Sequence, residues 1–224
     1  MKKHLYLLLF FFAIAFCSQA QIKKGDILLG GTIDFATQKT SPAQPNYIVS
    51  KQSSVNFNPS IGRAIKDNLI AGIDLMYSGS SYTQGSGPGS YSNNSHSYGA
   101  GFFIRRYLPL GSGFAIFMQS RLGGFYNTQK NSYQGTAFPY SDIKGYTVDL
   151  SFYPGVAYAI TKRVQLETGF ANLVDLSYAH SKSSVVNDPT VPAPPASKTN
   201  SFSLQTSLSN NFGFAVGIKV LLGS

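Results

Sequence analysis

Two histidines beyond the first twenty residues, His96 and His180, are the side chains best suited to acid–base chemistry at neutral pH. A surface protease or a lipid acyltransferase would combine such a histidine with a nearby serine or aspartate. Candidate partners lie close to both histidines in the sequence: Ser95, Ser97, Asp175, Ser177 and Ser181. Serine is abundant throughout the chain, so this proximity does not mark a nucleophile. No cysteine and no carboxylate cluster flanks either histidine, and the sequence therefore predicts no catalytic residue, no metal site and no cofactor.

A second set of chemistry-bearing residues consists of isolated charges among small and apolar neighbours. They are Asp34, Asp74, Arg105, Arg121, Asp149, Glu167 and Lys219. Rows of such charges inside a pore could select ions, as in a small channel. An unpaired charge away from water is costly, so the alternative is that they pair within a packed interior. We expect the packed arrangement, because a small barrel is just wide enough for side chains to fill it.

The elements that must position these residues are long β-strands. In the C-terminal stretch "FSLQTSLSNNFGFAVGIKVLL", nine of the eleven even positions from Phe202 to Leu222 are apolar. A period of two is the pattern of a strand with one apolar face. The same pattern predicts seven further strands, near Asp26–Thr37, Ser53–Ile65, Leu69–Ser78, His96–Leu108, Phe114–Thr128, Gly145–Ile160 and Val164–Tyr178.

The predicted connections alternate between short and long. Tight turns are expected at Ala64–Leu69, Leu108–Phe114 and Ile160–Val164. Long polar loops are expected at Gln38–Gln52, Gly79–Ser95, Gln129–Lys144 and Ala179–Asn200. This rhythm is typical of outer-membrane barrels. The predicted fold is therefore all-β: an eight-stranded antiparallel up-and-down transmembrane β-barrel with four long extracellular loops, short periplasmic turns and both termini periplasmic.

Closure of such a barrel brings the first and last strands together, which can bring Asp34 toward Lys219 in the lumen. Arg105 and Arg121 fall on adjacent predicted strands, and we expect Asp74, Asp149 or Glu167 to neutralise them. Two prolines, Pro59 and Pro154, interrupt otherwise regular strands, and we interpret them as local bulges near the periplasmic rim.

The composition favours lipid as the partner of the apolar face. Only 12% of residues are charged, about half of the roughly 25% of an ordinary soluble domain. The alternative is a secreted lipocalin-like barrel whose apolar face points inward. Aromatic girdles at both membrane interfaces support the membrane barrel. We expect them at Tyr77, Tyr126, Tyr146 and Tyr178 toward the loops, and at Tyr107 and Tyr158 toward the turns.

The first twenty residues predict export. Lys2 and Lys3 precede an apolar stretch, and Ser18-Gln19-Ala20 resembles a cleavage site. Residues 1–20 are therefore interpreted as a cleaved secretory signal peptide, with a short membrane anchor as the alternative, and 21–224 as one barrel domain. The formal charge of +9 falls to +7 without the two lysines. Its scattered distribution, together with export, predicts no nucleic-acid partner.

Three stretches carry a resemblance to a known family: "NPSIGRAIKDNLIAGIDLMY", "FFIRRYLPL" and "YPGVAYAITKRVQLETGF". From about Gly25 to Leu222 the chain resembles the small outer-membrane β-barrel family of OmpA/OmpX type. More narrowly, it is similar to the "outer membrane protein beta-barrel domain" branch, which includes PorT-like proteins. The resemblance implies the fold and a bacterial outer-membrane location, in the envelope of Gram-negative cells, and it implies no reaction.

Function is accordingly expected in the loops. Tyrosine beside serine, glycine and asparagine suits contact surfaces. The candidate contact residues are Tyr47, Tyr82, Tyr91, Tyr133 and Tyr140. The expected partners are outer-membrane lipid and an extracellular ligand or envelope protein. The alternatives are idle solvated loops, an accessory role in a secretion or assembly machine as the PorT-like branch implies, a small channel, and a loop-end enzyme.

Overall fold

The structure, a computed structural model, describes residues 22–41, 49–85, 89–133, 140–170, 173–186, 195–206 and 214–223. All regular elements within these ranges are β-strands. No helix in the described ranges is long and apolar enough to cross a membrane. The expected signal peptide, residues 1–20, lies outside the described residues.

Ten strands follow one another along the chain. They are β1 (Ile27–Thr40), β2 (Ser50–Lys66), β3 (Leu69–Gln84), β4 (Tyr91–Gly111), β5 (Phe114–Tyr133), β6 (Tyr140–Ala159), β7 (Val164–Phe170), β8 (Val174–Val186), β9 (Ser197–Thr206) and β10 (Phe214–Leu222). The predicted seventh strand corresponds to β7 and β8, and the predicted eighth to β9 and β10.

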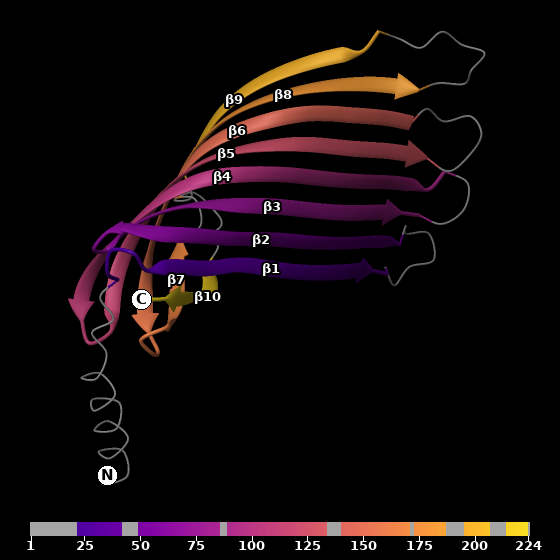
Figure 1. Ribbon diagram of the computed structural model, residues 1–224. Helices are drawn as coiled ribbons and strands as arrows, with labels where there is room; N and C mark the ends of the chain where they lie inside the picture. The colour runs from indigo at the N-terminus through magenta and orange to yellow at the C-terminus, as the bar shows by residue number, and fades with distance from the viewer. Residues whose placement is uncertain are drawn as a thin grey trace.

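The strands are antiparallel, and eight of them close into a ring. Strands β1 to β6 pair in chain order, β6 pairs with β7, β7 with β10, and β10 with β1. Strands β8 and β9 extend the sheet from the other half of β6. Figure 1 shows the ring at one end and, at the other, a curved sheet whose outermost strands are β1 and β9. The structure therefore has the predicted all-β up-and-down fold.

Short turns gather at the ring end, as predicted. Asp67 and Asn68 connect β2 to β3, Ser112 and Gly113 connect β4 to β5, and residues 160–163 connect β6 to β7. Asn68 has a φ of 59°, a left-handed conformation that asparagine tolerates better than most residues. The paired residues Ile27 and Leu222 lie at the same end.

The long loops are much shorter than predicted, because the strands continue into them. The connections are only 41–49, 85–90, 134–139 and 187–196. Strand β4 has 21 residues, whereas about 9–11 tilted residues span a bilayer. Serine, threonine, asparagine and tyrosine continue the backbone ladders here, so the composition that we interpreted as loop belongs to paired strand.

The prolines do not form rim bulges. The shift in the β2–β3 register lies between Ala64 and Lys66, not at Pro59. Pro59 is opposite Gly31 on β1 and has no partner in the β3 ladder, so its missing N–H interrupts only one side. Pro154 stays in register with Met118 and lies where β6 changes its partner from β8 to β7.

The hydrophobic core fills the ring end from within. Ile22, Leu28, Ile70, Phe103 and Phe117 are at most 3% exposed and pack in one cluster. Tyr107 belongs to this cluster at 2% exposure, which corrects its expected place in an outer girdle. The reason is strand parity: Tyr107 shares a face with Phe103 and Arg105, both of which point into the ring.

Candidate functional site

The inward faces of six strands bring the isolated charges together inside the ring. Asp74 lies on β3, Arg105 on β4, Arg121 on β5, Asp149 on β6 and Glu167 on β7. Each occupies a strand position whose neighbours at ±1 point outward, so the alternation of the sequence directs it inward. The remaining cation, Lys219, comes from β10 and lies beside them.

The first tier is a buried ion pair next to the core. Nη1 of Arg105 donates to both carboxylate oxygens of Glu167, at 2.6 and 2.7 Å, and the two side chains are 4% and 3% exposed. Tyr107 Oη donates to Glu167 at 2.9 Å, and Arg105 Nε donates to Gln119 at 2.8 Å. The guanidinium also lies 4.4 Å from the centre of the Phe117 ring. Charge and lone pairs are thus largely satisfied without water.

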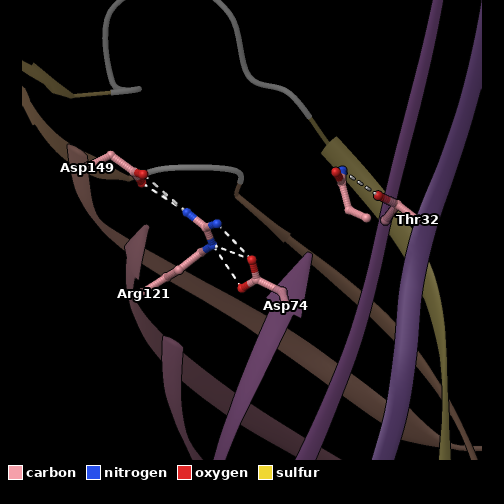
Figure 2. A network of polar contacts seen from close by, with 5 residues as sticks. Thr32, Asp74, Arg121 and Asp149 are labelled. Atoms are coloured by element: carbon pink, nitrogen blue, oxygen red, sulfur yellow. Dashed lines mark hydrogen bonds and ion pairs between the residues drawn. The ribbon is translucent and has the colours of Figure 1, made fainter. Parts of the chain in front are cut away.

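The second tier lies farther from the short turns than the first and joins three strands through Arg121 (Figure 2). Its Nη2 and Nε donate to Asp74 at 2.7 and 2.9 Å, and its Nη1 donates to Asp149 at 3.2 Å. The three side chains are each 12% exposed. A guanidinium shared between two carboxylates fixes the relative positions of β3, β5 and β6.

Two glycines make room for this arginine. Gly101 and Gly123 are opposite each other on β4 and β5, and Arg121 lies across both. A methyl group on Gly101 would lie 2.6 Å from Nη2 of Arg121, and one on Gly123 would lie 2.6 Å from a carboxylate oxygen of Asp149. The lumen is so narrow that the long side chain of Arg121 fits only because the positions beside it are glycines.

Asp34 and Lys219 do not meet. Lys219 is opposite Gly30 in the β1–β10 ladder, whereas Asp34 lies four residues further along β1, where it is exposed and opposite Asn56 of β2. In the described part of the chain, β10 pairs with β1 only over Ile27–Gly30. The expected closure therefore extends over the ring end alone, and Asp34 is beyond it.

The sequence reasoning missed Tyr107 and Gln119 as members of the first tier. Both have the parity of a predicted lumen charge on their own strand, Arg105 for Tyr107 and Arg121 for Gln119. Counting positions of ±2 from each predicted lumen charge would have placed both inside the ring. Tyrosine was assigned to a girdle by residue type, without regard to the face that its position selects.

The two histidines and the serines next to them point to opposite faces of their strands. His96 and His180 lie in strands β4 and β8, not in loops. Both contact tyrosines on the face of the sheet that points away from the lumen. Tyr77 Oη is 3.3 Å from Nδ1 of His96. The candidate partners Ser95, Ser97, Asp175, Ser177 and Ser181 all occupy odd positions, which point to the opposite face. Among the described residues, no group of three or more metal-binding side chains is arranged to hold an ion.

The loop tyrosines are mostly strand residues. Tyr82, Tyr91 and Tyr133 lie near the ends of β3, β4 and β5 and form a row of tilted ring contacts, with ring centres 6.2 and 5.1 Å apart. Tyr91 Oη donates to Asn131, which also accepts from Asn93. Tyr140 begins β6, and Tyr47 lies outside the described residues.

No family model matches the chain, and no curated protein matches it. Nine chains of solved structures are similar to it, and two of them have the following similarity. One is the translocator domain of the autotransporter NalP from Neisseria meningitidis, with 14% identity, a TM-score of 0.48, and coverage of 90% of this chain and 70% of that one. The other is Neisserial surface protein A (NspA), with 16% identity, a TM-score of 0.38, and coverage of 88% and 97%.

The lumen site is suited to holding strands together and to closing the ring. Its two arginines and three carboxylates bind one another, so they present no free acid or base to a substrate. Apolar and aromatic side chains fill the space between the first tier and the turns. The cavity beside Lys219 is one part of the described lumen with an unused hydrogen-bonding group, Asn58 Oδ1.

Proposed function

We propose that the chain is an integral outer-membrane β-barrel protein with a filled lumen, which acts through the strand ends that it presents outside the cell. One observation carries the proposal: charged groups are inside the ring, and large apolar side chains cover its outside. We further propose that the role is contact with an extracellular ligand or envelope protein, without catalysis. Export through a signal peptide ending at Ala20 would leave the short turns and both termini in the periplasm.

The outer wall exposes more apolar surface than a soluble protein usually exposes to water. Ile73, Leu75, Ile104 and Leu122 are 55%, 58%, 44% and 55% exposed on four neighbouring positions of β3 to β5. Soluble monomers rarely expose contiguous apolar patches larger than a few hundred square ångströms. In a lipid bilayer the same surface is solvated by acyl chains, and the backbone N–H and C=O groups of the ring pair in the ladders between neighbouring strands.

Aromatic rows mark the two edges of this wall. Tyr77, Tyr98, Tyr126 and Tyr146 are in register across β3 to β6. Phe114 and Tyr158 form a pair at the turn end, with ring centres 4.6 Å apart. The twelve residue-to-residue steps from Phe114 to Tyr126 span roughly 30 Å along the normal for a strand tilted by about 40°. This height is close to that of a bilayer core and supports the proposal that Tyr82, Tyr91 and Tyr133 lie beyond the membrane.

The strand ends beyond the row of Tyr77, Tyr98, Tyr126 and Tyr146 contain residue types that are common in contact surfaces. Tyr82, Tyr91 and Tyr133 lie among asparagine, glutamine and serine side chains, with few charges nearby. Tyrosine offers contact area at low entropic cost, and the amides and hydroxyls adapt to a partner. Because these side chains extend from paired strands, they are pre-positioned for binding.

Arginine substitutions on the outer wall test the membrane assignment. Ile104→Arg places a charge in the middle of the proposed bilayer, whereas Asn94→Arg places it on the same strand and the same face beyond the tyrosine row. We expect Ile104→Arg to cost about 2–4 kcal/mol of folding free energy in lipid vesicles, and Asn94→Arg about 0–1. Urea titrations in vesicles, followed by heat-dependent gel mobility, measure both.

A soluble barrel would give a different outcome. Its outer wall would face water, so the two arginines would have similarly small effects, and the protein would remain in solution after membranes are sedimented. The contact role has its own test: replacing Tyr82 and Tyr91 by serine should abolish cross-linking to a partner on intact cells. Ser81→Ala and Ser92→Ala, on the opposite face of the same strands, should leave it unchanged, and equal loss in both pairs would refute the role.

A further inference from the structure

Lys219 is an interior cation to which no carboxylate of the described chain binds directly. The sequence has nine acidic residues, of which only Asp188 lies outside the described ranges. None of the other eight has a carboxylate oxygen within 4 Å of the Lys219 ammonium. The ammonium reaches Ser60 Oγ at 3.4 Å, a long hydrogen bond to a neutral group. A charged ammonium removed from bulk water requires better compensation than one hydroxyl.

The position of this lysine is built into the wall. Lys219 is opposite Gly30 in the last rung of the described β1–β10 ladder, and its stem crosses the glycine. A methyl group on Gly30 would lie 2.6 Å from Nζ. The absence of a side chain on β1 therefore directs the lysine into the ring at the point where β1 and β10 cease to pair.

The ammonium reaches a cavity of about 210 Å³ at this point. Hydrogen-bonding side chains from β1 and β2 line it: Thr32, Asn58 and Ser60. Asn58 Nδ2 donates to Thr32 Oγ1 at 3.1 Å, while Asn58 Oδ1 is buried without a donor among the described residues. A water molecule occupies about 30 Å³ in the liquid, so the cavity has room for a small polyatomic group.

The lumen charges balance in number, but no carboxylate binds Lys219 directly. Asp74 and Glu167 also line it, but each is bound to an arginine, Asp74 to Arg121 and Glu167 to Arg105. Together with Lys219, the lining carries three cations and two anions, and Arg121 shares its charge with Asp149 outside the cavity. The cation of the lining that is not bound to a carboxylate is the lysine.

We propose that this cavity binds a phosphoryl group, with Lys219 as its ion-pair partner and Ser60, Thr32 and Asn58 as hydrogen-bonding groups. Lysine, hydroxyl and amide side chains are usual ligands of phosphate oxygens. A singly protonated phosphate also carries an O–H, which Asn58 Oδ1 accepts. The inference concerns the ring interior and does not depend on the contact role proposed for the strand ends.

Two sources supply this chemistry. Inorganic phosphate can enter from the open half of the lumen. A lipid headgroup can enter from the side, because Gly31 and Thr32 follow the last β1–β10 rung and line the cavity without a β10 partner in the described chain. The two sources share the ligand set, and the experiment separates them.

Binding to purified, folded protein in phosphate-free detergent tests the site. Inorganic phosphate is titrated by ³¹P NMR into the wild type, Lys219→Met and Lys182→Met. Methionine keeps the apolar stem over Gly30 and removes the charge, while Lys182 is an exposed lysine of β8 away from the cavity. Native mass spectrometry after extraction from phosphatidylglycerol or phosphatidylcholine bilayers measures retained lipid on the same three proteins.

We expect saturable binding of one probe that is weakened at least tenfold by Lys219→Met and unchanged by Lys182→Met. Retention of phospholipid without phosphate binding assigns the headgroup, and the reverse assigns the free anion. If Lys219→Met does not fold, Gly217→Leu keeps the charge and fills the cavity, since a Cβ at Gly217 meets nothing within 4 Å; the same loss is expected. Saturable binding that survives the substitutions, or no binding of either probe to the wild type, would overturn the site.

Discussion

At the scale of single residues, the Arg105–Glu167 pair is the most deeply buried ion pair among the described residues, at 4% and 3% exposure. Removing one partner leaves a charge without compensation, so Glu167→Leu and Arg105→Met should each lower the free energy of unfolding by about 3–5 kcal/mol. The double variant Arg105→Met with Glu167→Leu should recover most of that loss. Urea unfolding in detergent micelles checks the cycle, and additive losses in the double variant would contradict the coupling.

A pair of adjacent glycines provides a second test at this scale. Gly123 faces Arg121 and Asp149, whereas a methyl group on Gly124 meets nothing within 4 Å. A methyl group at Gly123 would force Arg121 to move and lose a hydrogen bond to a carboxylate. Gly123→Ala should therefore destabilise the barrel by about 1–3 kcal/mol. Gly124→Ala should be neutral within about 0.5 kcal/mol. Equal melting temperatures for the two variants would show that the lumen has more space than the geometry indicates.

At the scale of elements, the strands differ in how many neighbours they have. Strand β4 pairs along its length with β3 and β5, while β9 pairs in the described chain only with β8. Amides of Ser92–Ser97 should therefore exchange slowly with deuterium, although these residues have the composition of a loop. Every second amide of Ser197–Gln205, which points away from β8, should exchange at least tenfold faster. Uniform protection of β9 in exchange measured by NMR would mean that the barrel closes over its full height.

At the scale of the whole molecule, packed side chains close the ring at the end where the short turns lie. Ile22, Phe103, Tyr107 and Phe117 occupy that end together with the first charge tier. Planar bilayers containing the protein should show no stable conductance. Tyr107→Ala combined with Phe117→Ala should produce channel events, whereas Phe102→Ala, on the outer wall, should not. A large and steady open channel from the unmodified monomer would refute the filled lumen.

The sequence by itself determined which residues face inward, because a period of two assigns every strand residue to one of two faces. Arg105 and Glu167, 62 residues apart, were expected inside the barrel on this ground alone, and the short turns followed from the breaks in the same pattern. The tertiary structure decided which inward residues meet. A strand can slip by two residues and keep every side chain on its face, so alternation does not specify the register that joins Arg121 to Asp74 and Asp149. Strand length was also decided there: polar residues such as Ser92 and Asn93 have little strand preference of their own, and ladders with β3 and β5 on both sides keep them extended.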